Sequence, residues 1–297
     1  MKANQKIALI GCSNVAPASA YSLLNGPIGV DVLLNGQGAE QLLESVAGLQ
    51  SDLPTLQKST IRLGEPSELK DAKICILSSG LPPAAGDTED SFLSRNIDIV
   101  REQGKLLRKA GFNGVLVVTT NPAEIMAQAA MESCGLTAIS VIGIGPAAAG
   151  SMNSDRASLP LATWCSASGC GTEFIDSCHP DCPYFENMLD RFHRHQQMVS
   201  DSRPATMAAC VMRVCEAILS DEKAVLPVAV MLNGEHAIMG TFSTLPCVIG
   251  KHGVERILEF PLSENERKSL LDTARDTGRL FYRLTKKASV MASGKSA

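Results

Sequence analysis

The segment Gly11-Cys12-Ser13-Asn14-Val15-Ala16 has residue types and a position that could bind a phosphate group. It follows a short apolar run and precedes a stretch of small residues, which is typical of a tight turn between a strand and a helix. Glycine lets the backbone approach a ligand in such a turn, and the N-terminus of the helix supplies N–H donors. Asn35 follows the next apolar run, Val32-Leu33-Leu34, and its side chain can accept one hydrogen bond.

Four cysteines and a histidine form a second group that could do chemistry: Cys165, Cys170, Cys178, His179 and Cys182. The spacing within each cysteine pair falls at the loose end of the spacing in structural zinc sites. One interpretation is a zinc or iron–sulfur centre. The other, which we favour, is a set of free thiols, and we therefore expect no bound metal.

Strands and helices alternate through the first 145 residues. Apolar runs predict strands at Lys6–Gly11, Val32–Leu34, Ile74–Leu77, Val115–Thr119 and Ser140–Ile144. Helical spacing predicts helices at Val15–Leu24, Ala39–Leu49 and Asp90–Ala110. This alternation predicts an α/β fold with a doubly wound parallel sheet and right-handed crossovers.

The pattern changes after Gly145. Residues 146–182 are rich in Ala, Ser, Gly, Pro and Cys and show no clean period. Beyond them we expect helices at Phe185–Val199, Ala205–Leu219 and Ser263–Arg283, antiparallel strands at Leu226–Leu232 and Ile238–Ile249, and a frayed tail from about Lys286. We therefore divide the chain into a parallel-sheet domain, residues 1–145, and a smaller α+β domain, residues 146–297.

Composition excludes several classes of function. The 297 residues are 45% apolar and 20% charged, as in a globular protein, and suit about two domains. A net charge of −4 and only 4% aromatic residues argue against nucleic-acid binding. No apolar run reaches the roughly 18 residues of a membrane span, and the apolar run at Ile7 is too short for a signal peptide. We therefore expect a cytoplasmic protein.

The glycine-containing turn and four longer segments together resemble the L-lactate/malate dehydrogenase family. These four segments are Asp71–Pro82, Arg95–Val100, Val117–Met126 and Leu245–Arg256, and they occur in the family's order. The resemblance covers nearly the whole chain, and residues 146–204 match poorly. It implies a Rossmann-type dinucleotide-binding domain followed by the family's α+β substrate domain.

The family transfers a hydride between NAD and a 2-hydroxy acid. Its general acid/base is a histidine oriented by an aspartate, and its arginines hold the substrate carboxylate. Asn121 matches an asparagine that contacts both the nicotinamide ribose and the substrate. The cofactor-lining residues that the resemblance implies are Gly11, Ser13, Asn14, Val15, Asn35, Ser79, Gly80, Asn96 and Asn121.

The cofactor motif departs from the family at three positions. Ser13 stands where the second glycine would let the backbone approach the pyrophosphate, and Ala16 stands at the third glycine position, a tolerated change. Asn35 replaces the acid that would bind the adenosine ribose. We therefore expect binding of NAD or NADP to be weak or absent.

The substrate motifs depart further. In the segment Leu81–Glu89, which resembles I-P-x-x-P-G-x-T-R, Pro83 and Glu89 stand where two arginines are expected. Gly150 and Asn153 replace the orienting aspartate and the carboxylate-binding arginine. Glu89 places a negative charge where an anionic substrate would be attracted.

The position of the catalytic histidine is open between two alignments. Matching His179-Pro180-Asp181-Cys182 to the family's H-G-D-S keeps a histidine, His179. Matching Trp164–Glu173 to the strand before the family's G-E-H-G places Gly169 or Cys170 at the site. Arg203 could supply a relocated clamp for the substrate anion, although we favour a solvent-facing arginine there.

These departures favour a degenerate dehydrogenase that has lost most or all of its 2-hydroxy-acid activity and acts as a binding or scaffold protein. One alternative is an active NAD(P)-dependent oxidoreductase with a rebuilt site that uses His179 and Arg203. Another is a metal or redox sensor built on the cysteines. The resemblance also implies a homo-oligomer, a dimer by default or a tetramer, and a scaffold role implies a further protein partner.

Overall fold

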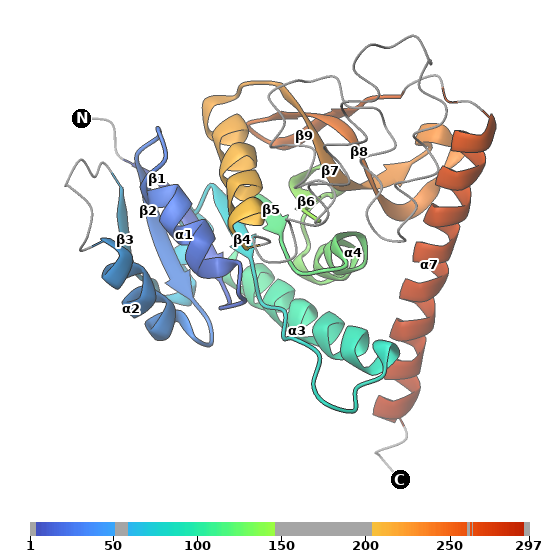
Figure 1. Cartoon of the computed structure of the whole chain (residues 1–297), viewed down its shortest axis with the longest axis horizontal. Helices are drawn as coiled ribbons and strands as arrows, with labels where there is room; N and C mark the ends of the chain where they lie inside the picture. The colour runs from blue at the N-terminus through green and yellow to red at the C-terminus, as the bar shows by residue number, and fades with distance from the viewer. Residues whose placement is uncertain (1–3, 51–58, 146–203, 260–261, 263, 294–297) are drawn as a thin grey trace.

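The computed structural model describes residues 4–50, 59–145, 204–259, 262 and 264–293. The strands form one nine-stranded sheet in the order β3-β2-β1-β4-β5-β6-β7-β8-β9 (Figure 1). Neighbours from β3 to β6 run parallel, and β7, β8 and β9 continue the sheet in antiparallel fashion. The strands are β1 (Gln5–Ile10), β2 (Val30–Asn35), β3 (Thr60–Leu63), β4 (Ile74–Leu77), β5 (Val115–Val118), β6 (Val141–Gly143), β7 (Ala224–Asn233), β8 (Met239–Gly250) and β9 (Gly253–Ile257).

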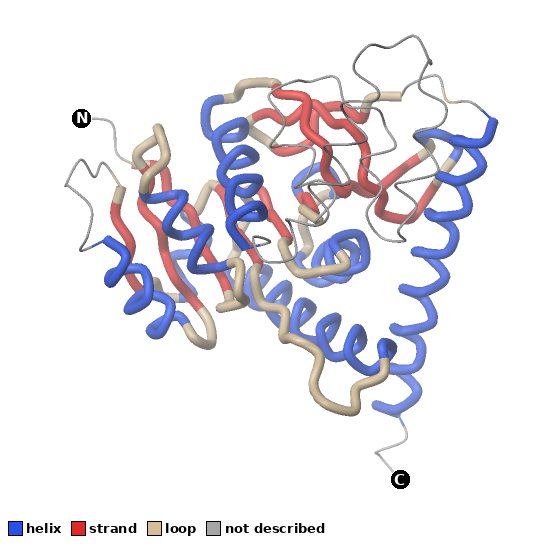
Figure 2. The backbone as a smooth tube through the Cα atoms, viewed as in Figure 1, coloured by secondary structure: helices blue, strands red, loops and turns tan. Residues whose placement is uncertain are grey.

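Helices cover both faces of the sheet (Figure 2). They are α1 (Ala16–Leu24), α2 (Ala39–Gln50), α3 (Glu89–Ala110), α4 (Ala123–Cys134), α7 (Glu264–Ser293) and a further helix over residues 204–220. The described residues also form the short 3-10 helices η1 (Pro66–Asp71), η2 (Ala138–Ser140) and η5 (Glu235–Ala237). None of the helices in the described residues is long and apolar enough to cross a membrane.

The central strand β1 explains why both faces need a cover. Ile7 and Leu9 are fully buried with α1, α2 and the 204–220 helix, whereas Ala8 and Ile10 are fully buried with α3 and α4. A parallel strand buried on both sides reads as a continuous apolar run rather than an alternating one. The run Ile7–Ile10 therefore contributes to an apolar core on each face of the sheet. The turn that follows it lies at the carboxyl end of β1.

The long helix α3 has clear signals at both ends. The Thr88 hydroxyl accepts a hydrogen bond from the Ser91 amide at 3.2 Å and caps the start of the helix. Gly111 ends it in the left-handed conformation with φ +77°. Thr88 thereby fixes where the preceding loop, residues 81–88, ends.

Most predicted elements are confirmed, including the five parallel strands and the two antiparallel strands. The sequence did not predict the strands β3 and β9, the helix α4 or the three short 3-10 helices. The predicted frayed tail is wrong over residues 286–293, because α7 continues to Ser293. The helix predicted at Phe185–Val199 lies outside the described residues.

The sheet continues across the proposed division at residue 145. Gly143 of β6 pairs with Ala229 of β7, and this pairing joins the parallel strands to the antiparallel ones. The division at residue 145 therefore separates two kinds of strand within one sheet, and as a domain boundary it stays a prediction.

Candidate functional site

The residues predicted to line a nucleotide lie at the carboxyl ends of β1, β2, β4 and β5, except Asn96, which lies in α3. Since β1 lies between β2 and β4, the connections that follow β1 and β4 pass to opposite faces of the sheet. In open α/β sheets, ligands bind outside the carboxyl ends of the strands at such a switch point. The fold therefore places the turn Gly11–Ala16 and Ser79 at the same edge.

The turn after β1 requires glycine at its first position. Gly11 has φ +90°, and a Cβ there would lie only 2.6 Å from the Ser78 carbonyl oxygen. Larger residues would both strain the backbone and clash with the end of β4. Gly11 thus keeps the ends of β1 and β4 in close contact.

Ser13 is tied into a hydroxyl chain that links three strand ends. Its amide donates to the Ser78 carbonyl oxygen at 2.9 Å, and the two hydroxyl oxygens lie 2.6 Å apart. The Thr119 hydroxyl in turn donates to the Ser78 hydroxyl at 3.0 Å. The serine at the second fingerprint position therefore bonds to its own fold rather than projecting freely toward a ligand.

This arrangement reduces the donors left for an anion. The Ala16 amide donates to the Ser13 carbonyl oxygen at 3.0 Å, and the Val15 amide to the Ser13 hydroxyl at 3.4 Å. The Cys12 and Asn14 amides have no acceptor among the described residues. The turn therefore fits a pyrophosphate, with two backbone donors and the N-terminus of α1.

Asn35, the predicted ribose contact, is 8% exposed and holds two strands together. Its side-chain amide donates to the Gly64 carbonyl oxygen at 2.8 Å. The backbone carbonyl oxygen of Asn35 accepts from the Gly11 amide at 3.3 Å. An aspartate here would bring a carboxylate against the Gly64 carbonyl. The hydrogen bond to Gly64 thus explains why an amide rather than an acid stands at position 35, which the sequence alone did not show.

Asn96 is almost fully buried and forms hydrogen bonds with the start of the loop that follows β4. Its side chain accepts from the Leu81 amide at 2.9 Å and donates to the Leu81 carbonyl oxygen at 3.1 Å. These two hydrogen bonds fix Leu81, at the start of the loop, against α3. Both polar groups of the Asn96 side chain are therefore used within the fold.

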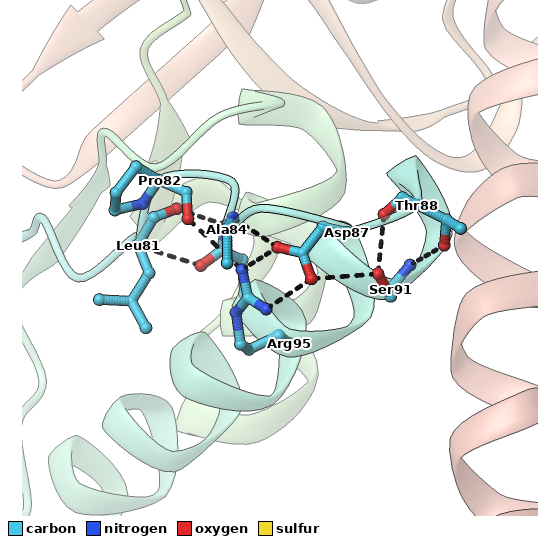
Figure 3. A network of polar contacts seen from close by, with 8 residues as sticks. Leu81, Pro82, Ala84, Asp87, Thr88, Ser91 and Arg95 are labelled. Atoms are coloured by element: carbon cyan, nitrogen blue, oxygen red, sulfur yellow. Dashed lines mark hydrogen bonds and ion pairs between the residues drawn. The ribbon is translucent and has the colours of Figure 1, made fainter.

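The same loop is closed by Asp87 and Arg95 (Figure 3). Arg95 donates to both oxygens of the Asp87 carboxylate, Nη1 to Oδ1 at 3.0 Å and Nη2 to Oδ2 at 2.6 Å. The Ala84 amide also donates to Oδ2, at 2.7 Å. These bonds, that of Arg95 first, lower the pKa of Asp87 to about 2. The network folds the loop back onto α3.

The two positions where the family has loop arginines offer no cation. Pro83 and Glu89 are both exposed. Glu89 begins α3, where a negative charge favours the helix dipole. The next residue, Asp90, is paired with Arg283 of α7 at 2.8 Å. The loop therefore presents acidic rather than basic side chains near its end.

Asn121 remains available at the carboxyl end of β5. Its side chain is exposed and has no hydrogen bond within the described residues. The preceding Thr120 packs against Gly80, where a Cβ would meet the Thr120 methyl carbon at 2.6 Å. Ser79 bonds back to the β1 carbonyl of Ile10 at 3.2 Å. The structure thus brings the segments of Gly80 and Asn121 together, and their role in cofactor binding stays a prediction.

Sequence reasoning missed a buried polar contact between the two halves of the chain. Glu124, at the start of α4, is 2% exposed and accepts a hydrogen bond from the Thr244 hydroxyl of β8 at 2.7 Å. The signal was present, since Glu124 is one carboxylate within the small apolar run Ala123–Ala130. It orients the beginning of α4 next to Asn121.

Several predicted site residues lie outside the described residues: Gly150, Asn153, Cys165, Gly169, Cys170, Cys178, His179, Cys182 and Arg203. Among the described cysteines Cys12 is exposed and five are buried. Burial raises the pKa of both Cys210 and Cys215 to about 12. No group of three or more metal-binding side chains occurs in the described part of the chain. The absence of bound metal stays a prediction.

Two domain models of one sequence family match the chain. Residues 5–143 match the family described as lactate/malate dehydrogenase, NAD binding domain, and residues 196–277 match its alpha/beta C-terminal domain. The L-lactate dehydrogenase of Limosilactobacillus reuteri is 24% identical, over 92% of this chain and 93% of that protein. The L-lactate dehydrogenase of Latilactobacillus sakei subsp. sakei is 26% identical, over 92% and 93%.

Solved structures show the same fold. A lactate dehydrogenase from a Medee basin deep-sea metagenome library superposes with a TM-score of 0.74 at 23% identity, covering 95% of this chain and 99% of that one. The malate dehydrogenase of Archaeoglobus fulgidus in complex with NADH gives 0.73 at 20% identity, covering 95% and 100%.

Proposed function

The chain belongs to the lactate/malate dehydrogenase family, and from this premise we propose that it is a divergent member whose 2-hydroxy-acid dehydrogenase activity is lost or strongly reduced. Its fold then serves as a binding or scaffold protein. The proposal concerns the substrate site, since the fold and the edge that would hold a nucleotide are those of the family.

The observation that carries the proposal is the pairing of Arg95 with Asp87. Arg95 is the only arginine between residues 81 and 95, and Asp87 takes both arms of its guanidinium. A substrate carboxylate needs the same bidentate geometry. With Pro83 and Glu89 at the positions of the family's loop arginines, this segment has no cation left for a 2-keto acid.

The nucleotide site supports weak binding of NAD or NADP. Such a cofactor would supply the hydride acceptor or donor when bound. The Asn14 amide, the Cys12 amide and the start of α1 would hold its pyrophosphate, and Asn121 would bind the nicotinamide ribose. The Ser13 hydroxyl is already bonded to Ser78 and adds no free donor for the pyrophosphate.

One observation favours the second candidate, an active oxidoreductase with a rebuilt site. Asn121 is exposed and unbonded within the described residues, at the position where the family contacts substrate. A keto acid bound there would need a proton donor and a cation from elsewhere in the chain. His179 and Arg203 are the residues we assign to those roles in this alternative.

Family resemblance also supports a cytoplasmic homo-oligomer. We take a homodimer as the default assembly, with a tetramer as the alternative. Analytical ultracentrifugation of the purified chain tests this assignment, and a monomer at high protein concentration would refute it.

Binding of oxamate, an unreactive isostere of pyruvate, tests the proposal. Calorimetry is run with NADH at a concentration first shown to saturate the protein, so that weak cofactor binding does not hide the result. We expect no saturable oxamate binding, because Arg95, the one arginine of residues 81–95, is already paired with Asp87. The L-lactate dehydrogenase of Limosilactobacillus reuteri is the positive control. Saturable, NADH-dependent binding to this chain would refute the proposal.

A further inference from the structure

A polar cavity of about 300 Å³ lies at the amino ends of the parallel strands. Its lining includes Lys73, directly before β4, Ser140, directly before β6, and Asn113, close to the start of β5. Lys70 comes from the end of η1, and Lys251 with His252 forms the turn between β8 and β9. Because amino and carboxyl ends of parallel strands lie at opposite edges, this cavity is separate from the site after β1.

Two close backbone approaches build the walls of the cavity. A Cβ on Gly114 would collide with the Lys73 carbonyl oxygen, so the chain before β5 lies directly against the chain before β4. Gly253, with φ +102°, packs in the same way against the Ile139 carbonyl oxygen. The second approach holds the Lys251–His252 turn over the start of β6.

The lining carries an excess of positive charge. Lys70, Lys73 and Lys251 have no ion-pair partner within the described residues. The acid of the lining, Asp71, lies 3.5 Å from the Lys6 ammonium.

The acid nearest to the Lys251 backbone is occupied as well. Asp221 accepts from the Lys251 amide at 2.8 Å and pairs with Lys223 at 2.8 Å. Three lysines therefore line one concave site against a single acid of the lining, Asp71, although the whole chain has a net charge of −4. Concave walls concentrate the field of such charges and raise the local concentration of anions.

We propose that this cavity binds a small molecule through a phosphate or pyrophosphate group. Lysine ammonium groups bind phosphate as point charges, without the fixed geometry that arginine imposes. The Asn113 amide and the Ser140 hydroxyl can hydrogen-bond a polar remainder of the ligand. The volume is at the lower end of the roughly 300–1,000 Å³ of small-molecule pockets, which favours a compact ligand.

Calorimetric titration with inorganic pyrophosphate tests the proposal. The test variant is Lys73→Gln/Lys251→Gln, and the matched control is Lys109→Gln/Lys268→Gln, which removes the same charge from exposed positions on α3 and α7. We expect saturable binding to the unaltered protein and to the control. In the test variant Kd should rise at least about tenfold, which equals about 1.4 kcal/mol.

Three results would overturn the proposal. One is the absence of saturable binding to the unaltered protein. Another is an equal Kd in the test variant, which would place the pyrophosphate elsewhere, for example at the turn after Gly11. The third is tighter binding of citrate than of pyrophosphate, which would assign the cavity to carboxylates. All four substituted lysines are exposed, so thermal unfolding should confirm intact folding in both variants.

Discussion

Arg95 of α3 holds both carboxylate oxygens of Asp87, eight residues earlier in the chain, at 3.0 and 2.6 Å. The pair closes the loop between β4 and α3 with groups that come from the loop and its own helix. The Arg95 guanidinium is therefore fully engaged by an internal carboxylate, and the loop is held against α3.

The pair predicts a pH dependence of stability. Arg95 and the Ala84 amide lower the pKa of Asp87 to about 2 in the folded chain, below the value of about 3.9 in an unfolded chain. The stabilisation is therefore complete above about pH 5 and is lost as the pH falls toward about 2. Urea unfolding across this range should show a smaller loss of unfolding free energy in Asp87→Asn than in the unaltered protein.

Asp98→Asn is the matched control for this prediction. Asp98 is exposed on the same helix and has no ion pair within the described residues. It should keep the pH dependence of the unaltered protein. Equal slopes in Asp87→Asn and the unaltered protein would show that the pair does not contribute.

Asn35→Asp should destabilise the fold. The Gly64 carbonyl oxygen would lose its donor and face a carboxylate in a buried position. Leaving a buried group unsatisfied costs about 1–3 kcal/mol, measurable by chemical unfolding near neutral pH. The same change at exposed Asn121 is the control and should leave stability unaltered. An Asn35→Asp variant as stable as the control would contradict the structural role of Asn35.

The sequence predicted the parallel half well because its strands are buried. Runs such as Ile74–Leu77, fully buried on both faces, give an unbroken apolar signal. The edge strand β3, Thr60–Leu63, is mostly exposed and mixes polar with apolar residues, so it gave no such run. The helix α4 is buried on nearly all sides, so its sequence lacks the polar face by which a helix is recognised.

The candidate site was harder to predict than the fold. The motifs indicated that Gly11, Ser79, Gly80 and Asn121 line a cofactor, which stays a prediction, and all four lie at one edge of the sheet. They could not show which side chains the fold itself uses, since partners such as Gly64 for Asn35 and Leu81 for Asn96 come together only through the sheet. The partner of Glu124 is 120 residues away in sequence, at Thr244.

NADH should bind this chain about tenfold more weakly than it binds the L-lactate dehydrogenase of Limosilactobacillus reuteri. A hydrogen bond to a charged acceptor contributes about 1–1.5 kcal/mol more than one to a neutral acceptor, which is about one decade in Kd. Asn35 also removes the repulsion that an acid exerts on a 2′-phosphate, so NADPH should lose less affinity. Calorimetry with both nucleotides measures this. Low-micromolar NADH binding, clearly tighter than NADPH binding, would contradict the prediction.

Alkylation should be much faster at Cys12 than at the five buried cysteines of the described residues. The thiolate is the reactive form, and burial raises the pKa of Cys210 and Cys215 to about 12. With iodoacetamide at mildly alkaline pH, peptide mass spectrometry of the folded protein should find Cys12 labelled first and the five buried thiols protected. Labelling of Cys210 or Cys215 as fast as Cys12 would show that the 204–220 helix opens readily.

Turnover of short 2-keto acids is the most direct test of the account. NADH oxidation is followed with pyruvate, oxaloacetate and related acids, using the unaltered protein and the variant His179→Ala. We predict rates near background for both, because loss of the general base alone costs about 10²–10⁴ in rate and Arg95 is held by Asp87. Robust turnover that His179→Ala abolishes would contradict the account and establish a rebuilt dehydrogenase site.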